Sequence, residues 1–287
     1  MTAIDIGADL GVGRAAPGRA DKRLGGAAIR VAGGVASAGV SLGAVLLAWW
    51  GFLKWFHVKP FIGKGPVNVY RYLVTSAAAS EHRRLLFGES RTTLRDAMLG
   101  LVAGTAAALV CAAGFNLSRS MQRTLMPIAM VLRSVPLVAM TPLIVLVFGR
   151  GLPAITVISG IVTFFPTLVN VTLALRATPK ESIDLLTAYG ASRAMTLWKV
   201  QVPSALPALF ASLRIAAPLA LVGALLAEWL ATGKGLGYQI LQSAALSNYS
   251  GLWARVAAVT FYSVMLYKMI GIVERLVLRR YARAYGR

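Results

Sequence analysis

Long apolar stretches alternate with shorter polar ones along most of this chain. Six stretches approach the length of about 20 apolar residues that a helix needs to cross a bilayer. They fall at about 29–53, 94–115, 124–147, 153–175, 205–230 and 253–277. The pattern predicts an all-α, polytopic membrane protein with about six transmembrane helices.

Composition supports a membrane protein. The chain is 57% hydrophobic and 14% charged, whereas a soluble domain carries about 25% charged residues. The formal net charge of +20 would also suit a nucleic-acid-binding protein. No basic stripe interleaved with aromatic residues on a soluble module is found, however, so we expect no nucleic-acid partner.

Lys and Arg at the ends of the spans predict the orientation of the chain. If the N-terminus is cytoplasmic, the inner segments hold 16 of these residues and the outer segments hold 10, so we expect both termini in the cytoplasm. The predicted order is a cytoplasmic basic segment (1–28), the first transmembrane helix (29–53), an extracytoplasmic segment (54–91), a five-helix core (92–277) with a cytoplasmic loop (178–203), and a cytoplasmic basic tail (278–287).

A polar, helix-forming segment separates the fourth and fifth predicted spans. Thr178 and Glu181 have the spacing of a capping box at the start of a helix. Gly190 suits the left-handed position that ends such a helix. Ser192 can cap a second short helix, which Pro203 would end. We therefore expect a helix–glycine–helix loop that projects into the cytoplasm. An amphipathic helix resting on lipid headgroups is the alternative.

The spacing within this loop resembles the EAA loop of the permease subunits of bacterial ABC importers. That motif has Glu-Ala-Ala, then Gly, then Ile and Leu-Pro at fixed intervals. Its positions are occupied here by Asp184, Leu185 and Leu186 for the triplet, Gly190, Val200 for the isoleucine, and Val202 with Pro203 for the Leu-Pro pair. The intervals are kept, while leucines stand where the motif has alanines.

Four stretches, in order, resemble the nitrate/sulfonate/taurine-type branch of these permeases, and the resemblance covers about residues 91–280. They are LRSVPLVAMTPLIVLVFG (132–149), FFPTLVNVTLALR (164–176), GASRAMTLWKVQVPSALPALFASLRIA (190–216) and AEWLATGKGLGYQI (227–240). The resemblance implies a type I ABC importer-like permease fold in the bacterial inner membrane.

The resemblance also implies partners and a role. Two permease subunits, two copies of this chain or this chain with a second permease, would form the path, and cytoplasmic ATP-binding subunits would dock on the loop. An extracytoplasmic solute-binding protein would deliver a small solute such as a sulfonate, taurine or nitrate, although related permeases also serve uncharged pyrimidine or vitamin-like solutes and aromatic acids. The chain has no GxxxxGK[ST] phosphate loop. ATP and Mg would therefore be bound by the partner, and the chain would be no enzyme and carry no cofactor. The implied coupling residues are Glu181, Asp184, Leu185, Leu186, Ala188, Gly190, Ala191, Ser192, Leu197, Val200 and Pro203.

Ionisable residues inside spans are costly and mark functional candidates. Arg133 and Arg214 each lie about nine residues from the cytoplasmic end of a span, which is about 14 Å and near mid-membrane. We expect them, with Pro136, Met140 and Glu228, to line the translocation path. In the alternative, each arginine pairs within the bundle and Glu228 is an exposed interface residue.

Two other classes of protein remain open. A non-transport membrane scaffold could use the same loop to bind a soluble protein. A secondary transporter would need acids within spans, and Glu228 is the only deep one, because Asp96 and Glu274 lie near span ends. No catalytic triad or metal-ligand set is recognisable, so we expect no catalytic residue and no metal.

Overall fold

The computed structural model describes residues 39–285 and divides the chain into two compact units, 1–59 and 60–287. The first unit contributes one described helix, Gly39–Trp55, which is apolar but short for a span. The predicted segment 1–28 and residues 29–38 of the predicted first span lie outside the described residues.

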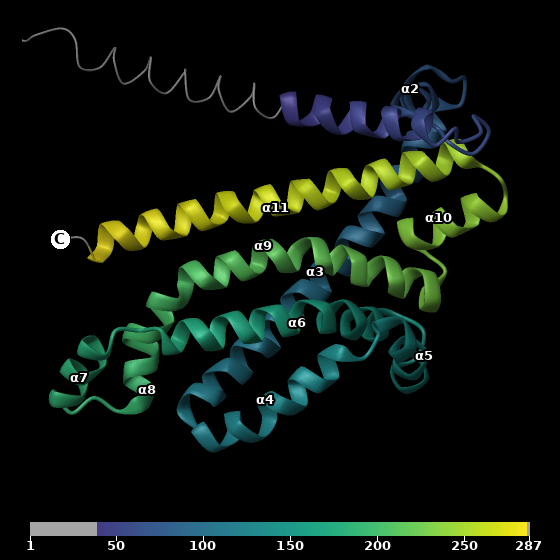
Figure 1. Ribbon diagram of the computed structural model, residues 1–287. Coiled ribbons are helices and arrows are strands. Elements are labelled where there is room, and N and C mark those ends of the chain that lie inside the picture. Colours follow the sequence, from purple (N-terminus) through teal and green to yellow (C-terminus); the bar gives the residue numbers. More distant parts are fainter. Residues whose placement is uncertain (1–38, 286–287) are drawn as a thin grey trace, which may run out of the picture. The chain divides into compact units, whose positions relative to one another are not determined.

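Every regular element in the described part of the second unit is a helix (Figure 1). Its elements are α2 (Pro66–Tyr70), the π turn η1 (Arg71–Thr75), α3 (Ala79–Leu117), α4 (Arg119–Ser134), α5 (Leu137–Phe148), α6 (Leu152–Arg176), α7 (Lys180–Ala188), α8 (Arg193–Thr196), the π turn η2 (Leu197–Gln201), α9 (Val202–Ala227), the π turn η3 (Glu228–Thr232), α10 (Gly235–Ala245) and α11 (Tyr249–Tyr285). The all-α prediction is confirmed.

Four described helical stretches are long and apolar enough to cross a membrane. They are Ala79–Leu117, Leu152–Arg176, Arg193–Thr232 and Tyr249–Tyr281. A fifth span exists if α4 and α5 together make one. The predicted count of six is therefore not reached within the described residues. Helix α3 also begins well before the predicted span, so its first turns belong to the stretch expected as an extracytoplasmic segment.

The span predicted over 124–147 is broken in the structure. Helices α4 and α5 meet at an angle of 105°, and the break falls at Val135 and Pro136. Val135 is extended, with φ −74° and ψ 126°, because the ring of a following proline disfavours the helical conformation. Pro136 has no amide hydrogen to continue the helix. The Ser134 hydroxyl instead donates to the Val131 carbonyl at 2.7 Å.

Helices α3, α6 and α9 form the centre of the second unit and make its most extensive helix contacts (Figure 1). Small residues allow this approach. A Cβ on Gly104 would overlap the backbone of Gly160 and the Thr163 side chain. The Ser159 hydroxyl donates to the Ala220 carbonyl of α9 at 2.9 Å. Close backbone contact and interhelical hydrogen bonds are the forces that hold helices together in lipid.

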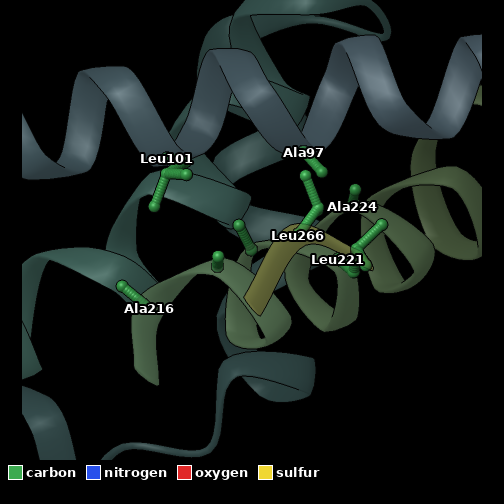
Figure 2. Packing of buried hydrophobic residues seen from close by; sticks show 8 residues of the cluster. Ala97, Leu101, Ala216, Leu221, Ala224 and Leu266 are labelled. Carbon is green, nitrogen blue, oxygen red and sulfur yellow. The ribbon is translucent and has the colours of Figure 1, made fainter. Parts of the chain in front are cut away.

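A second layer of contacts joins α11 to this centre. Figure 2 shows Ala97 and Leu101 of α3 facing alanines and Leu221 of α9, with Leu266 of α11 against them. Alanines dominate the α9 side, and Ala224 is fully buried. These contacts place α9 between α6 and α11, so a displacement of α9 is felt by both neighbours.

Candidate functional site

The loop between α6 and α9 begins differently from the prediction. The Thr178 side chain is buried, and its hydroxyl donates to the Leu175 carbonyl at 3.1 Å. Thr178 therefore closes α6, and Pro179 occupies the N-cap of α7 without a side-chain cap. The predicted capping box of Thr178 with Glu181 is wrong, because the threonine is held by the preceding helix.

The turn after α7 forms as the sequence predicts. Gly190 has φ +76°, which glycine adopts without steric cost. Its amide donates to the Thr187 carbonyl at 2.9 Å, and the Ala191 amide donates to the Leu186 carbonyl at 2.9 Å. This pair of bonds is a Schellman motif, which satisfies the last carbonyls of a helix. These two hydrogen bonds fix the turn between α7 and α8 at Gly190.

Ser192 then starts the second helix of the loop, and its hydroxyl accepts a hydrogen bond from the Met195 amide at 3.2 Å. The prediction that Pro203 ends this helix is wrong. A continuous helical stretch runs from Arg193 to Thr232. In the π turn η2, the Val202 amide donates to the Leu197 carbonyl. A π turn is a local widening of the helix, and here it carries the helix past the proline.

The base of the loop is tied to the membrane helices by residues that the sequence did not single out. Gln201 is buried, and its Nε2 donates to the Leu175 carbonyl of α6 at 3.3 Å. The Asn116 side chain, near the end of α3, donates to Gln201 Oε1 at 2.6 Å. Leu197 is buried in the apolar cluster that includes Leu168. A lone glutamine between apolar runs was the only signal for this anchor.

The tip of the loop is exposed. Glu181, Asp184, Ala188 and Ser192 lie on its surface. Leu186, Ala191, Val200 and Pro203 are half-buried. Four large apolar side chains of this loop are exposed: Leu185 at 59%, Tyr189 at 83%, Met195 at 44% and Trp198 at 66%. Tyr189 and Trp198 were not among the predicted coupling residues, although aromatic residues in a polar loop are a recognisable signal.

The predicted path residues do not gather in one place. Arg133 is exposed in the last turn of α4, Pro136 is the N-cap of α5, and Met140 packs partly buried beside the cluster that contains Ile144. These three share the α4–α5 break. Arg214 instead forms an ion pair with Glu274 of α11, which is the pairing that the sequence left open as an alternative.

Glu228 lies at the other end of α9 and is fully buried. Its Oε2 accepts a hydrogen bond from the Gly237 amide at 2.8 Å, in the first turn of α10. The neighbouring Leu236 amide donates to Thr93 Oγ1 of α3 at 2.9 Å. This bond satisfies one of the amides in the first turn of α10 that have no partner within the helix. The structure thus gives Glu228 a contact that fixes α10 to α9.

The same end of the unit holds an ion pair that the sequence did not predict. The Arg255 guanidinium of α11 donates from Nε and Nη2 to the two Glu89 oxygens of α3, both at 2.8 Å. Its Nη1 donates to Ser243 Oγ of α10 at 3.1 Å. A bidentate pair fixes orientation as well as distance. The pair ties α3, α10 and α11 together at the end opposite α7 and α8 (Figure 1).

The second unit is thus a bundle of apolar helices in which one membrane-length helical stretch begins in an exposed, capped loop. Residues 100–283 match the family described as the binding-protein-dependent transport system inner membrane component. The chain belongs to this family. It is an inner-membrane permease subunit of an ABC importer and not an enzyme, since ATP hydrolysis belongs to a separate subunit in this class.

Individual relatives agree with the family. An ABC transporter permease protein of Haemophilus influenzae is 31% identical over 79% of this chain and 90% of its own length. The riboflavin transport system permease protein of Chloroflexus aurantiacus is 34% identical over 56% of this chain and 60% of its own length. The taurine transport system permease protein of Escherichia coli is 26% identical over 79% and 82%. Aliphatic sulfonate and nitrate permeases are also among the relatives.

The fold is also found in a solved structure. The methionine ABC transporter MetNI, in an inward-facing conformation, superposes with a TM-score of 0.58 at 20% identity, covering 70% of this chain and 99% of the other. This likeness supports the type I importer permease fold.

Replacing Gly235 by alanine should destabilise the turn between α9 and α10. Its φ is +85°, and a Cβ there would overlap the Glu228 carboxyl group. Gly233→Ala is the matched control, because its φ is +66° but the nearest atom, Tyr238 Cε2, is 3.8 Å away. Thermal unfolding in detergent should show a loss of about 1–2 kcal/mol for the control and about 1–3 kcal/mol more for Gly235→Ala.

In a Glu228→Ala background the additional cost of Gly235→Ala should disappear, because the overlapping carboxyl group is gone. Equal unfolding temperatures for the two single glycine variants would contradict this account of the turn.

Proposed function

We propose that α7 and α8 are the surface on which the ATP-binding subunits of this importer dock, and that the movement of these subunits reaches the membrane through α9. The observation that carries the proposal is the continuity of one helical stretch from Arg193 to Thr232. A helix that begins at the loop and crosses the membrane can transmit a displacement without a flexible joint.

The chemistry of the tip fits a docking surface. Leu185, Tyr189 and Trp198 expose apolar and aromatic area beside polar residues, and buried aromatic anchors dominate the energy of many protein interfaces. The Gly190 turn and the Gln201 anchor hold the tip in one position, so little conformational entropy is lost on docking. An interfacial helix lying on lipid would need none of this fixed geometry.

The remaining partners follow from the same assignment. An extracytoplasmic solute-binding protein delivers the solute, a second permease copy completes the path, and ATP with Mg binds in the partner subunits. Both termini then lie in the cytoplasm, with α10 and η3 at the extracytoplasmic end. Alternating access is produced when the two permease copies move relative to each other.

Trp198→Ala should weaken binding of the ATP-binding subunit by roughly tenfold, because a large exposed anchor is removed from the docking surface. Trp229→Ala is the control, since Trp229 is also exposed but lies about 45 Å further along the same helical stretch. Affinity is measured by titrating the purified ATP-binding subunit onto each permease variant in nanodiscs.

Equal affinity for the Trp198 variant and the wild type would place the docking surface elsewhere. Failure of the wild type to bind any ATP-binding subunit would instead favour a scaffold or a secondary transporter.

We further propose that the transported solute is a small organic or inorganic anion, such as a sulfonate, taurine or nitrate. Relatives named for taurine, sulfonate and nitrate support this class. Arg133 also supports it, because its side chain is exposed beside the α4–α5 break and no ion pair of the described residues includes it. Arg214, which is paired with Glu274, is a less suitable anion contact.

Arg133→Gln should reduce uptake of labelled taurine or nitrate by the complete transporter about tenfold, because a charge-assisted contact is lost. Arg133→Lys, which keeps the charge, should retain most of the uptake. Equal uptake by the glutamine variant and the wild type would remove Arg133 from the path, and uptake of neither solute by the wild type would overturn the proposed class.

A further inference from the structure

A wide cleft opens beside the loop that contains α7 and α8, which is named the coupling loop. It has a volume of about 1410 Å³ and lies between the end of α3, the start of α4, the end of α6 and the α7–α8 loop. The exposed tip residues Leu185, Tyr189 and Trp198 are not part of its lining. The cleft shares α7 and α8 with the proposed docking surface, and Asp184 and Ala191 line it, but none of these three exposed side chains does.

The walls of the cleft carry an excess of positive charge. Five exposed basic side chains line it, contributed by α4, α6, α7 and α8: Arg119, Arg123, Arg176, Lys180 and Arg193. Asp184 is the one acid of the lining. Among the described residues, the three ion pairs involve none of these five cations. A converging set of unneutralised cations attracts an anion.

The cleft also has an apolar wall. Met126, Pro127 and Met130 of α4 line it next to the basic residues. From Arg123 to Met130 the helix rises by about 10 Å, and this helix belongs to the bent apolar pair that can form one span. A basic mouth at the end of a span, continued by an apolar wall along the span, matches a molecule with a charged head and an apolar tail.

A second copy of the chain fits this cleft poorly. A symmetric contact would bring the same cations together, and the chain has only 10 Asp and Glu against 30 Lys and Arg. Three of those acids, Glu89, Asp96 and Glu274, already form ion pairs, and Glu228 is buried. Few acids are left to neutralise the basic wall.

We propose that this cleft binds an anionic phospholipid of the cytoplasmic leaflet. The phosphate lies among Arg119, Arg123 and Arg176, and one acyl chain lies along Met126 and Met130. Basic pockets between membrane helices on the cytoplasmic side are suited to anionic headgroups. A lipid held there contacts α4, α6 and the coupling loop at once, so membrane composition can influence the position of the loop.

The test compares Arg123→Gln/Arg176→Gln with a matched control, Arg279→Gln/Arg280→Gln, which removes two exposed charges from the end of α11. Each full-length protein is placed in nanodiscs of phosphatidylcholine and phosphatidylglycerol and transferred to detergent. Native mass spectrometry then counts the phosphatidylglycerol retained. The cleft variant should retain roughly tenfold less than the wild type, while the control retains as much as the wild type.

Both variants should unfold at the wild-type temperature. If the Arg123→Gln/Arg176→Gln variant unfolds at a lower temperature, Arg119→Gln/Arg123→Gln is used as the cleft variant instead. Equal retention by the cleft variant and the wild type overturns the proposal, as does an equal loss in the tail control. Complete displacement of the lipid by inorganic phosphate would show a site for free anions instead. If the cleft variant loses binding of the ATP-binding subunit but retains the lipid, the cleft is part of the docking surface for that subunit, and the proposal is overturned.

Discussion

The close approach of α3, α6 and α9 is the constraint on which the rest of the structure depends. Lipid tails are as apolar as leucine, so burying leucine gives membrane helices little reason to associate. Close packing of backbones and hydrogen bonds from side chains to the backbone of a neighbouring helix must supply the stability instead. Gly100 and Gly104 bring α3 against Ser159, Gly160 and Thr163 of α6. The Thr163 hydroxyl reaches the Gly100 carbonyl at 3.3 Å, so the contact is polar as well as close.

The packing of α3, α6 and α9 determines how a force on the coupling loop reaches the membrane helices. The loop joins α9 without a break, and the side chain of Gln201 binds both the Leu175 carbonyl and Asn116. A force on the tip therefore acts on three helices that are already locked together. At the opposite end, Glu228 and the pair of Arg255 with Glu89 fix α10 and α11 to the same helices. Both ends of the second unit are thus anchored to the same packed helices.

The sequence predicts those features that depend on local chemistry. Apolar length located four of the six predicted spans, and the Gly190 turn and Ser192 cap formed where the residue types favour them. Features decided by contacts between distant segments were not predictable in this way. Gln201 binds the Leu175 carbonyl of α6, Arg255 binds Glu89 of α3, and Arg214 pairs with Glu274 of α11. Each depends on which helix lies alongside, which no single stretch of sequence specifies.

Proline shows the limit of local rules most clearly. Pro136 breaks its helix, with a bend of 105°, whereas Pro203 lies inside a continuous helical stretch because a π turn precedes it. Both prolines follow a valine, yet Pro136 was expected within a span and Pro203 at the end of a helix, and the structure reverses these two expectations. The difference is set by the packing of Leu197 and Gln201 against α3 and α6.

The most direct test of the central claim is the thermal stability of Gly104→Ala compared with Gly88→Ala. Both glycines are in α3, but nothing lies within 4 Å of a Cβ on Gly88, whereas a Cβ on Gly104 meets the α6 backbone. Gly88→Ala should be neutral or stabilising by up to about 1 kcal/mol. Gly104→Ala should lose about 1–3 kcal/mol. Equal stability of the two variants would show that the close contact of α3 with α6 does not hold the bundle together.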